Sequence, residues 1–134
     1  MTFLPDTNAC IALLRATHPA IIARWRASPV SQMALCSVVV YELRHGAERC
    51  RNPQLEHLKL DGFLEPYLSL PFDDVSARRC AEIRRVLEAD GARIGPHDLQ
   101  IAAIALQHRL TLITHNTREF ARIPGLQLED WTVA

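Results

Sequence analysis

Three carboxylates stand in apolar surroundings, where an ionised acid is costly unless a cation or a hydrogen-bond donor accompanies it. Asp6 directly follows a short apolar run, Glu42 lies within the apolar segment 38–43, and Asp98 opens the apolar segment 99–106. If the fold brings the three acids together, they repel one another unless a cation lies among them. Oxygen ligands favour hard ions, so the sequence predicts a site for Mg²⁺, with Mn²⁺ as a substitute.

An ion held in this way suits the hydrolysis of phosphodiesters. Mg²⁺ pairs with phosphate oxygens, lowers the pKa of a bound water and stabilises a leaving oxygen. A carboxylate that does not bind the ion can take the proton of the water, and we predict this role for Glu42. Taken singly, each acid also has an ordinary explanation, because Asp6 can cap a helix, Asp98 suits a helix start, and Glu42 can form an ion pair. Only the combination of the three indicates a site.

Other kinds of catalytic or metal site find little support. The chain has no G-x-S-x-G, P-loop or G-x-G-x-x-G motif, and its histidine spacings match no zinc motif. The four cysteines form no C-x-x-C pair, which indicates reduced thiols. His97 and His115 adjoin candidate site residues, and we expect both at the surface or in a supporting position around the site.

Short apolar runs alternate with helical segments along the chain. We expect strands at 2–5, 33–36, 67–70, 110–114 and 126–129, and helices at 9–15, from 19 onward, 37–48, 53–63, 73–90, 96–106 and 117–121. Ser37 is expected to cap the third of these helices. Such alternation implies a mainly parallel sheet, whose ligands bind beyond the carboxyl ends of the strands. Asp6 and Asn116 both follow a strand closely.

The composition predicts one globular domain, residues 1–134, with no net charge, since 15 basic residues balance 15 acidic ones. A neutral chain counts mildly against a nucleic-acid partner. The arginines that could contact RNA lie on and after the long helix: Arg78, Arg79, Arg84, Arg85 and Arg93. We expect most of them to pair with Glu82 and Glu88. We see no targeting sequence and no apolar stretch that could cross a membrane, so we expect a cytoplasmic protein without membrane contact.

Five segments resemble the VapC-type PIN-domain toxins, in order along nearly the whole chain. They are Leu-Pro-Asp-Thr-Asn at 4–8 and the segments 37–47, 94–103, 114–120 and 129–131. The resemblance implies an α/β fold, an α/β/α sandwich with a short, mainly parallel sheet flanked by helices. It also implies a magnesium-dependent endoribonuclease, the toxin of a toxin–antitoxin pair, with structured RNA such as tRNA as a common substrate. Such toxins form homodimers and bind a small antitoxin, through which alone they contact DNA.

The resemblance extends to individual site residues. Asp6, Glu42 and Asp98 match the three acids of the family, and Thr7 and Thr114 match small hydroxyl residues that line its site. We therefore expect these five side chains to surround one point.

Three further positions carry expectations from the same resemblance. Asn116 stands where many PIN domains have a fourth acid, so we expect it to bind a metal-bound water in the catalytic site, with less charge for a second ion. Arg84 matches an arginine that is frequent in the subgroup, and we expect it to contact RNA. His97 replaces an apolar or aromatic residue and is expected to touch substrate or to have no role.

Two other classes of function stay open. One is a related magnesium-dependent nuclease or phosphatase, although phosphatases that use an aspartyl-phosphate have D-x-D after the first strand, and Asn8 breaks that pattern. The other is a PIN-like module that binds RNA or protein without cutting. Loss of one acid would indicate such a module, and all three are present. Replacement of Asp6 or Asp98 by alanine separates enzyme from module, because only an enzyme loses activity.

Overall fold

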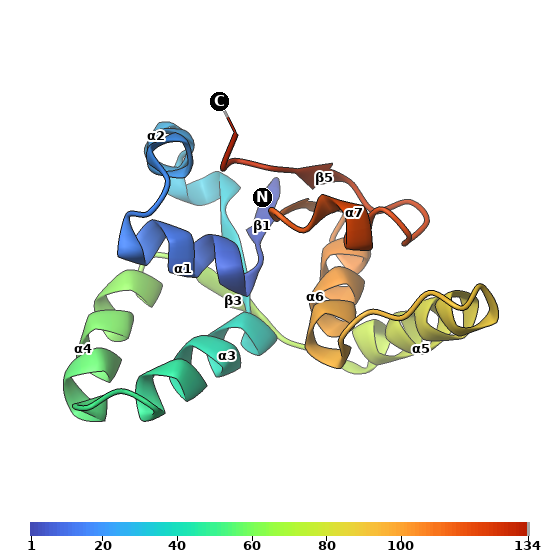
Figure 1. Cartoon of the computed structure of the whole chain (residues 1–134), viewed down its shortest axis with the longest axis horizontal. Helices are drawn as coiled ribbons and strands as arrows, with labels where there is room; N and C mark the ends of the chain where they lie inside the picture. Colours follow the sequence, from blue (N-terminus) through green and yellow to red (C-terminus); the bar gives the residue numbers. More distant parts are fainter. Residues whose placement is uncertain (134) are drawn as a thin grey trace.

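The computed structural model describes residues 1–133, so the last residue of the predicted domain 1–134 lies outside the described part. The strands are β1 (Phe3–Pro5), β2 (Ala34–Cys36), β3 (Leu68–Leu70), β4 (Thr111–Ile113) and β5 (Leu128–Glu129). The helices are α1 (Thr7–Arg15), α2 (Pro19–Ala27), α3 (Ser37–Glu48), α4 (Pro53–Leu64), α5 (Asp74–Ala89), α6 (Pro96–Gln107) and α7 (Thr117–Phe120), with a 3₁₀ turn at Val30–Gln32. The order of strands and helices predicted from the sequence is confirmed (Figure 1).

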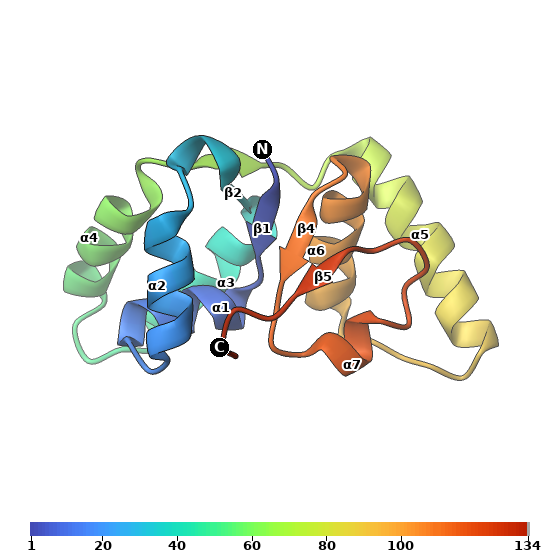
Figure 2. The ribbon, with the colours of Figure 1, turned by 90° about the horizontal axis from the view of Figure 1, so that it is seen from above.

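All strand pairs are parallel. β1 pairs with β4 and β4 with β5, while β2 pairs with β3 in a second small sheet. A single parallel bridge between Phe3 and Met33 joins the two sheets beside β1. The predicted short parallel sheet is therefore present, although hydrogen bonding divides it into two parts. One consequence is that the carboxyl ends of β1, β4 and β5 share one edge (Figure 2).

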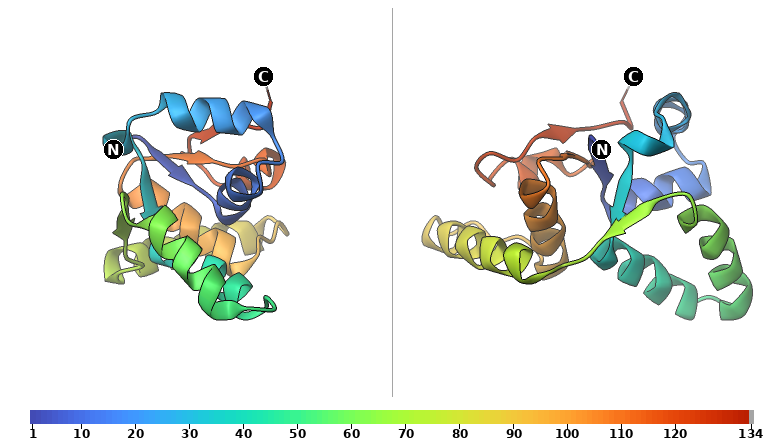
Figure 3. Two further views of the ribbon diagram at one scale, coloured as in Figure 1. Left: turned by 90° about the vertical axis from the view of Figure 1, so that its left-hand side faces the viewer. Right: turned by 180° about the vertical axis from the view of Figure 1, so that it is seen from behind.

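Helices cover both sides of this sheet. α2 lies on one side and α3 and α6 on the other, while α5 packs along α6 (Figure 3). The small residues of α6 allow this close approach, since Ala102, Ala103 and Ala105 are fully buried. Trp131 anchors the end of the chain, with its ring 5.0 Å from that of Phe3. Burial of one large apolar side chain contributes about 1.5–3 kcal/mol, so these contacts hold the last segment on the sheet.

The start of α3 corrects one prediction. Ser37 was expected to cap this helix, but it is the first helical residue, and the preceding Cys36 is the N-cap, without a side-chain hydrogen bond. The Ser37 hydroxyl instead accepts a hydrogen bond of 3.1 Å from the backbone N–H of Phe72. The hydroxyl therefore ties α3 to the loop after β3, a contact that local sequence does not reveal.

Two predictions from composition can be compared with the fold. All four cysteines are free thiols, as predicted. Among residues 1–133, no helix is both long enough and apolar enough to cross a membrane.

Candidate active site

The carboxyl edge of the sheet brings the first candidate residues together. The register of β1 and β4 pairs Pro5 with Ile113, so the residues that follow them, Asp6 and Thr114, emerge side by side. The backbone N–H of Asp6 donates to the carbonyl of Ile113 at 2.9 Å, which continues the pairing by one residue. This pairing fixes the Asp6 carboxylate at the point where α1 begins.

Asp6 is buried and held by hydrogen bonds. Its side chain is 4% exposed and accepts a bond of 2.8 Å from the backbone N–H of Ala9, so it caps α1 as well. The hydroxyl of Thr114 also bonds to Asp6, and it accepts from the backbone N–H of Asn116 at 3.0 Å. Burial nevertheless raises the pKa of Asp6, and the charges of Glu42 and Asp130 add to the rise against the two bonds. The two hydrogen-bond donors do not offset the free energy that burial costs the charged carboxylate, so a cation beside it would be favourable.

Glu42 reaches the same region from α3. Its Oε1 accepts a hydrogen bond of 2.5 Å from the hydroxyl of Thr7 in α1. Its Oε2 lies 3.4 Å from Nδ1 of His97 in α6, and the His97 ring stands edge-on to Tyr41 with centroids 5.3 Å apart. These contacts join three helices around one half-buried carboxylate. His97 therefore adjoins the site through Glu42, where it can hold that side chain in place.

Asp98 completes the group from the first turn of α6, which starts with Pro96 after Gly95. Burial, together with the negative charges of Asp6, Glu42 and Glu119, raises the pKa of Asp98 to about 6, although the nearby His97 acts in the opposite direction. Carboxylates raise one another's pKa appreciably only when they lie close together, so these acids are near neighbours. The structure thus brings the three predicted acids, Asp6 before α1, Glu42 in α3 and Asp98 in α6, to one edge of the sheet.

The donor set fits Mg²⁺ or Mn²⁺, because it offers carboxylate and amide oxygens and no thiolate. Within the described residues, however, no three His, Cys, Asp or Glu side chains already surround one point as metal ligands. The side chain of Glu42 or Asp98 would have to rotate before three carboxylates could bind one metal ion. Repulsion between unneutralised carboxylates is a sufficient reason for their separation here.

Glu119 and Asp130 lie near this group of acids, and neither of them was assigned a role from the sequence. Asn116 is exposed, and its amide nitrogen donates a hydrogen bond to Oε2 of Glu119, which leaves the amide oxygen free of that bond. Asp130, just after β5, is close enough for its charge to act on Asp6. Both acids belong to segments that the family resemblance had marked, 114–120 and 129–131, and this was the only signal for them.

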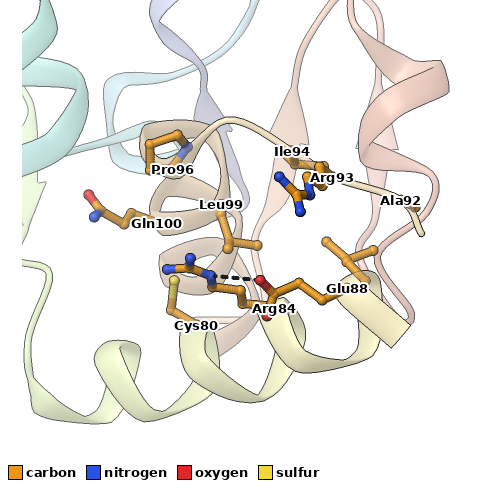
Figure 4. Close-up of a pocket in the computed structure, with 10 residues that line it drawn as sticks. Cys80, Arg84, Glu88, Ala92, Arg93, Ile94, Pro96, Leu99 and Gln100 are labelled. Atoms are coloured by element: carbon orange, nitrogen blue, oxygen red, sulfur yellow. Dashed lines mark ion pairs between the residues drawn. The ribbon is translucent and has the colours of Figure 1, made fainter. Parts of the chain in front are cut away.

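Arg84 lies apart from the acids. It lines a pocket of about 330 Å³ between α5 and the start of α6, and its Nε is 3.5 Å from Glu88 (Figure 4). None of the predicted metal ligands lines this pocket. Arg78 pairs with Glu82 at 3.4 Å in the same manner. The expected pairing is confirmed for Arg78. Arg84, which was expected to contact RNA, also pairs with Glu88, and its contact with RNA stays a prediction.

Comparison with known proteins places these features in context. The PIN-domain family model matches residues 3–126. The tRNA(fMet)-specific endonuclease VapC of Salmonella typhimurium is 34% identical over 131 residues, which cover 98% of each chain. The structure of DNA-bound VapBC from Salmonella typhimurium superposes with a TM-score of 0.91 at 34% identity, over 98% of both chains. VapBC-5 from Mycobacterium tuberculosis, a member of the VapBC family of toxin–antitoxin systems, gives 0.71 at 26% identity over 96% of both.

Proposed function

The chain belongs to the PIN-domain family, as a VapC-type toxin ribonuclease of a toxin–antitoxin system, and on that premise we propose that it hydrolyses phosphodiester bonds of RNA with Mg²⁺ bound by Asp6, Glu42 and Asp98. The observation that carries the proposal is the convergence of three acids from separate helices, with the pKa of Asp98 raised to about 6 by burial and by the other carboxylates. A cation bound there would relieve this repulsion.

Each side chain has a distinct task in this proposal. Bound Mg²⁺ would activate water and stabilise the leaving oxygen. Asp6 is fixed by Ala9 and Thr114, so it presents one invariant ligand position. Glu42, which the Thr7 hydroxyl orients, is the third ligand, and when its carboxylate is released from the ion it accepts the proton of the attacking water. The free amide oxygen of Asn116 holds a water at the rim of the site.

We propose tRNA as the substrate class, because a relative over the full length is a tRNA(fMet)-specific endonuclease. The test is digestion of total RNA by purified protein with Mg²⁺ and with EDTA, beside the Asp6→Ala variant. Discrete cuts in tRNA that need both Mg²⁺ and Asp6 are expected. If wild type and Asp6→Ala are both folded and both silent, the binding-module alternative is favoured instead. Equal cutting by both proteins would mean a contaminating nuclease or a different site.

The partner we propose is a small antitoxin protein, as in the VapBC complexes that this chain resembles. A groove of about 310 Å³ between α1, α3 and α4 is a suitable place for it. Apolar side chains line the groove, among them Ile11, Leu14, Leu43 and Leu60, and Glu42 lies on its wall. An antitoxin segment seated there would reach the acids, and a cationic side chain on it would be attracted to them. We also propose a homodimer, which light scattering would detect.

Leu14→Asp is expected to separate inhibition from catalysis. Leu14 lines the groove and is 45% exposed, so a carboxylate there is tolerated by the fold but places a charge in an apolar interface. Affinity for the antitoxin should fall by about a hundredfold, as for loss of a central interface residue, while RNA cutting by free toxin is unchanged. Calorimetry and cleavage assays measure the two effects. Leu58→Asp is the matched control, since Leu58 of α4 is 66% exposed and does not line the groove. Equal losses for both variants would reject this groove.

A further inference from the structure

A histidine–aspartate pair lies at the same edge of the sheet and has no part in the proposed mechanism. His115 follows Thr114 at the end of β4, and Asp130 follows β5. Nδ1 of His115 is 3.0 Å from Oδ2 of Asp130 and 3.0 Å from the hydroxyl of Thr132. The ring itself is mostly exposed, with 75% of the side chain accessible. The pair therefore holds one ring nitrogen, while most of the ring stays open to solvent.

The hydrogen bonds decide which nitrogen carries the proton. The Thr132 hydroxyl donates its one hydrogen to Oδ1 of Asp130 at 2.6 Å, so toward His115 it can only accept. An ionised Asp130 can also only accept. Burial would raise the pKa of Asp130, but hydrogen bonds from Thr132 and His115 lower it below its usual value, so the group is ionised at neutral pH. Both partners of Nδ1 are acceptors, so Nδ1 is the donor and Nε2 of a neutral ring is an acceptor.

The position of this acceptor relates it to the cleaved strand. The residue before His115 is Thr114, whose hydroxyl binds Asp6, and the next residue is Asn116. Asp130, which holds the ring, is close enough to Asp6 for its charge to raise the pKa of that acid, so the ring lies near the acids. It lines a pocket of about 140 Å³ with Asn8, Thr114 and Asp130. A strand whose phosphate lies at the acids can therefore present its adjoining sugar to this pocket.

We propose that Nε2 of His115, fixed as an acceptor by Asp130 and Thr132, receives a hydrogen bond from a ribose 2′-hydroxyl next to the cut, and so distinguishes RNA from DNA. The inference rests on the proposed ribonuclease function. A 2′-hydroxyl is a donor that every ribonucleotide carries and deoxyribonucleotides lack. His115 is thereby a specificity residue, and Asp130 is the positioning residue that sets its tautomer.

The test uses an RNA oligonucleotide that copies the strongest cut site found in total RNA. Single 2′-deoxy replacements are made at each nucleotide around the cut, and kcat/KM is measured for wild type, His115→Phe and His115→Asn. For wild type, the 2′-deoxy replacement at one position should lower kcat/KM by about three- to tenfold, the range expected for loss of one net hydrogen bond. His115→Phe should abolish the loss at that position alone, and His115→Asn, which keeps an acceptor, should restore part of it. His18→Phe is the control, because His18 lines the same pocket and, within residues 1–133, its ring forms no hydrogen bond or ion pair with an aspartate.

Nuclear magnetic resonance of the ring nitrogens gives a readout that does not depend on activity. The Nδ1–H tautomer is expected in wild type, and Asp130→Ala should release it toward a mixture of tautomers. If wild type cuts the oligonucleotide but His115→Phe keeps the same 2′-deoxy profile, this inference is wrong and the ribonuclease function stands. If wild type fails to cut RNA under any condition, the proposed function fails and this inference fails with it. A wild-type Nε2–H tautomer would also overturn it.

Discussion

Replacing Asp98 with asparagine is expected to abolish RNA cleavage and to raise the melting temperature of the protein at pH 8 in metal-free buffer. The carboxylate at this position is ionised at pH 8, although burial and its acidic neighbours raise its pKa to about 6 from the usual value of 3.8. That difference corresponds to at most about 3 kcal/mol of lost stability, and to less once solvent screening of this partly buried side chain is taken into account. Asparagine has no charge, so it removes this cost together with a ligand of the proposed Mg²⁺.

The expected loss in kcat/KM is at least about a hundredfold, the effect typical of removing one group that stabilises charge in a transition state. The melting temperature is expected to rise by several degrees in scanning calorimetry. Glu82→Gln is the matched control, because Glu82 is exposed on α5 and pairs with Arg78, so both properties should stay near wild type. A folded Asp98→Asn variant with a lower melting temperature would mean that Asp98 mainly stabilises the start of α6.

The order of the elements and the three acids of the site could be predicted from the sequence. Hydrophobic spacing and capping residues act locally, which is why the strands at 3–5 and 111–113 and the helix at 96–107 lie close to their expected ranges. Asp6 and Asn116 stand out because each follows a strand, and the sites of parallel sheets lie at strand ends. The predicted fold class is confirmed by these parallel strands and by the match to the PIN-domain family.

Contacts between distant segments could not be predicted in this way. Glu119 and Asp130 lie in polar surroundings that mark no site, and only the pairing of β4 with β1 and β5 brings them near Asp98 and Asp6. The tautomer of His115 depends on a residue 15 positions further along. The position of Arg84, in contrast, depends on a local contact, its i,i+4 pair with Glu88 on the same helix.

Competition between protons and Mg²⁺ for the same carboxylates makes the effect of Mg²⁺ on stability depend on pH. The pKa values of Asp98 and Asp6 are both raised in the metal-free fold, that of Asp98 to about 6. Between about pH 4 and pH 6 the folded state therefore holds more protons than the unfolded state. Metal-free stability falls as the pH rises through that interval and levels off above it. A cation bound by the same carboxylates competes with these protons, so it stabilises the fold most above pH 6.

Thermal unfolding in EDTA and in millimolar Mg²⁺, from pH 4 to pH 8, measures this effect. In EDTA the melting temperature should fall as the pH rises from 4 to 6, because the carboxylates lose their protons. Mg²⁺ should restore the melting temperature at pH 8 but have little effect at pH 4.5. Cleavage should follow the same curve, with none in EDTA and a steep decline below about pH 6, where Asp98 takes up a proton. In Asp98→Asn the stabilisation by Mg²⁺ should be nearly lost, while Glu82→Gln keeps it. A Mg²⁺ effect of equal size at all pH values, or an equal one in Asp98→Asn, would place the ion away from these acids, since a site that includes Asp98 must exchange its proton for the metal.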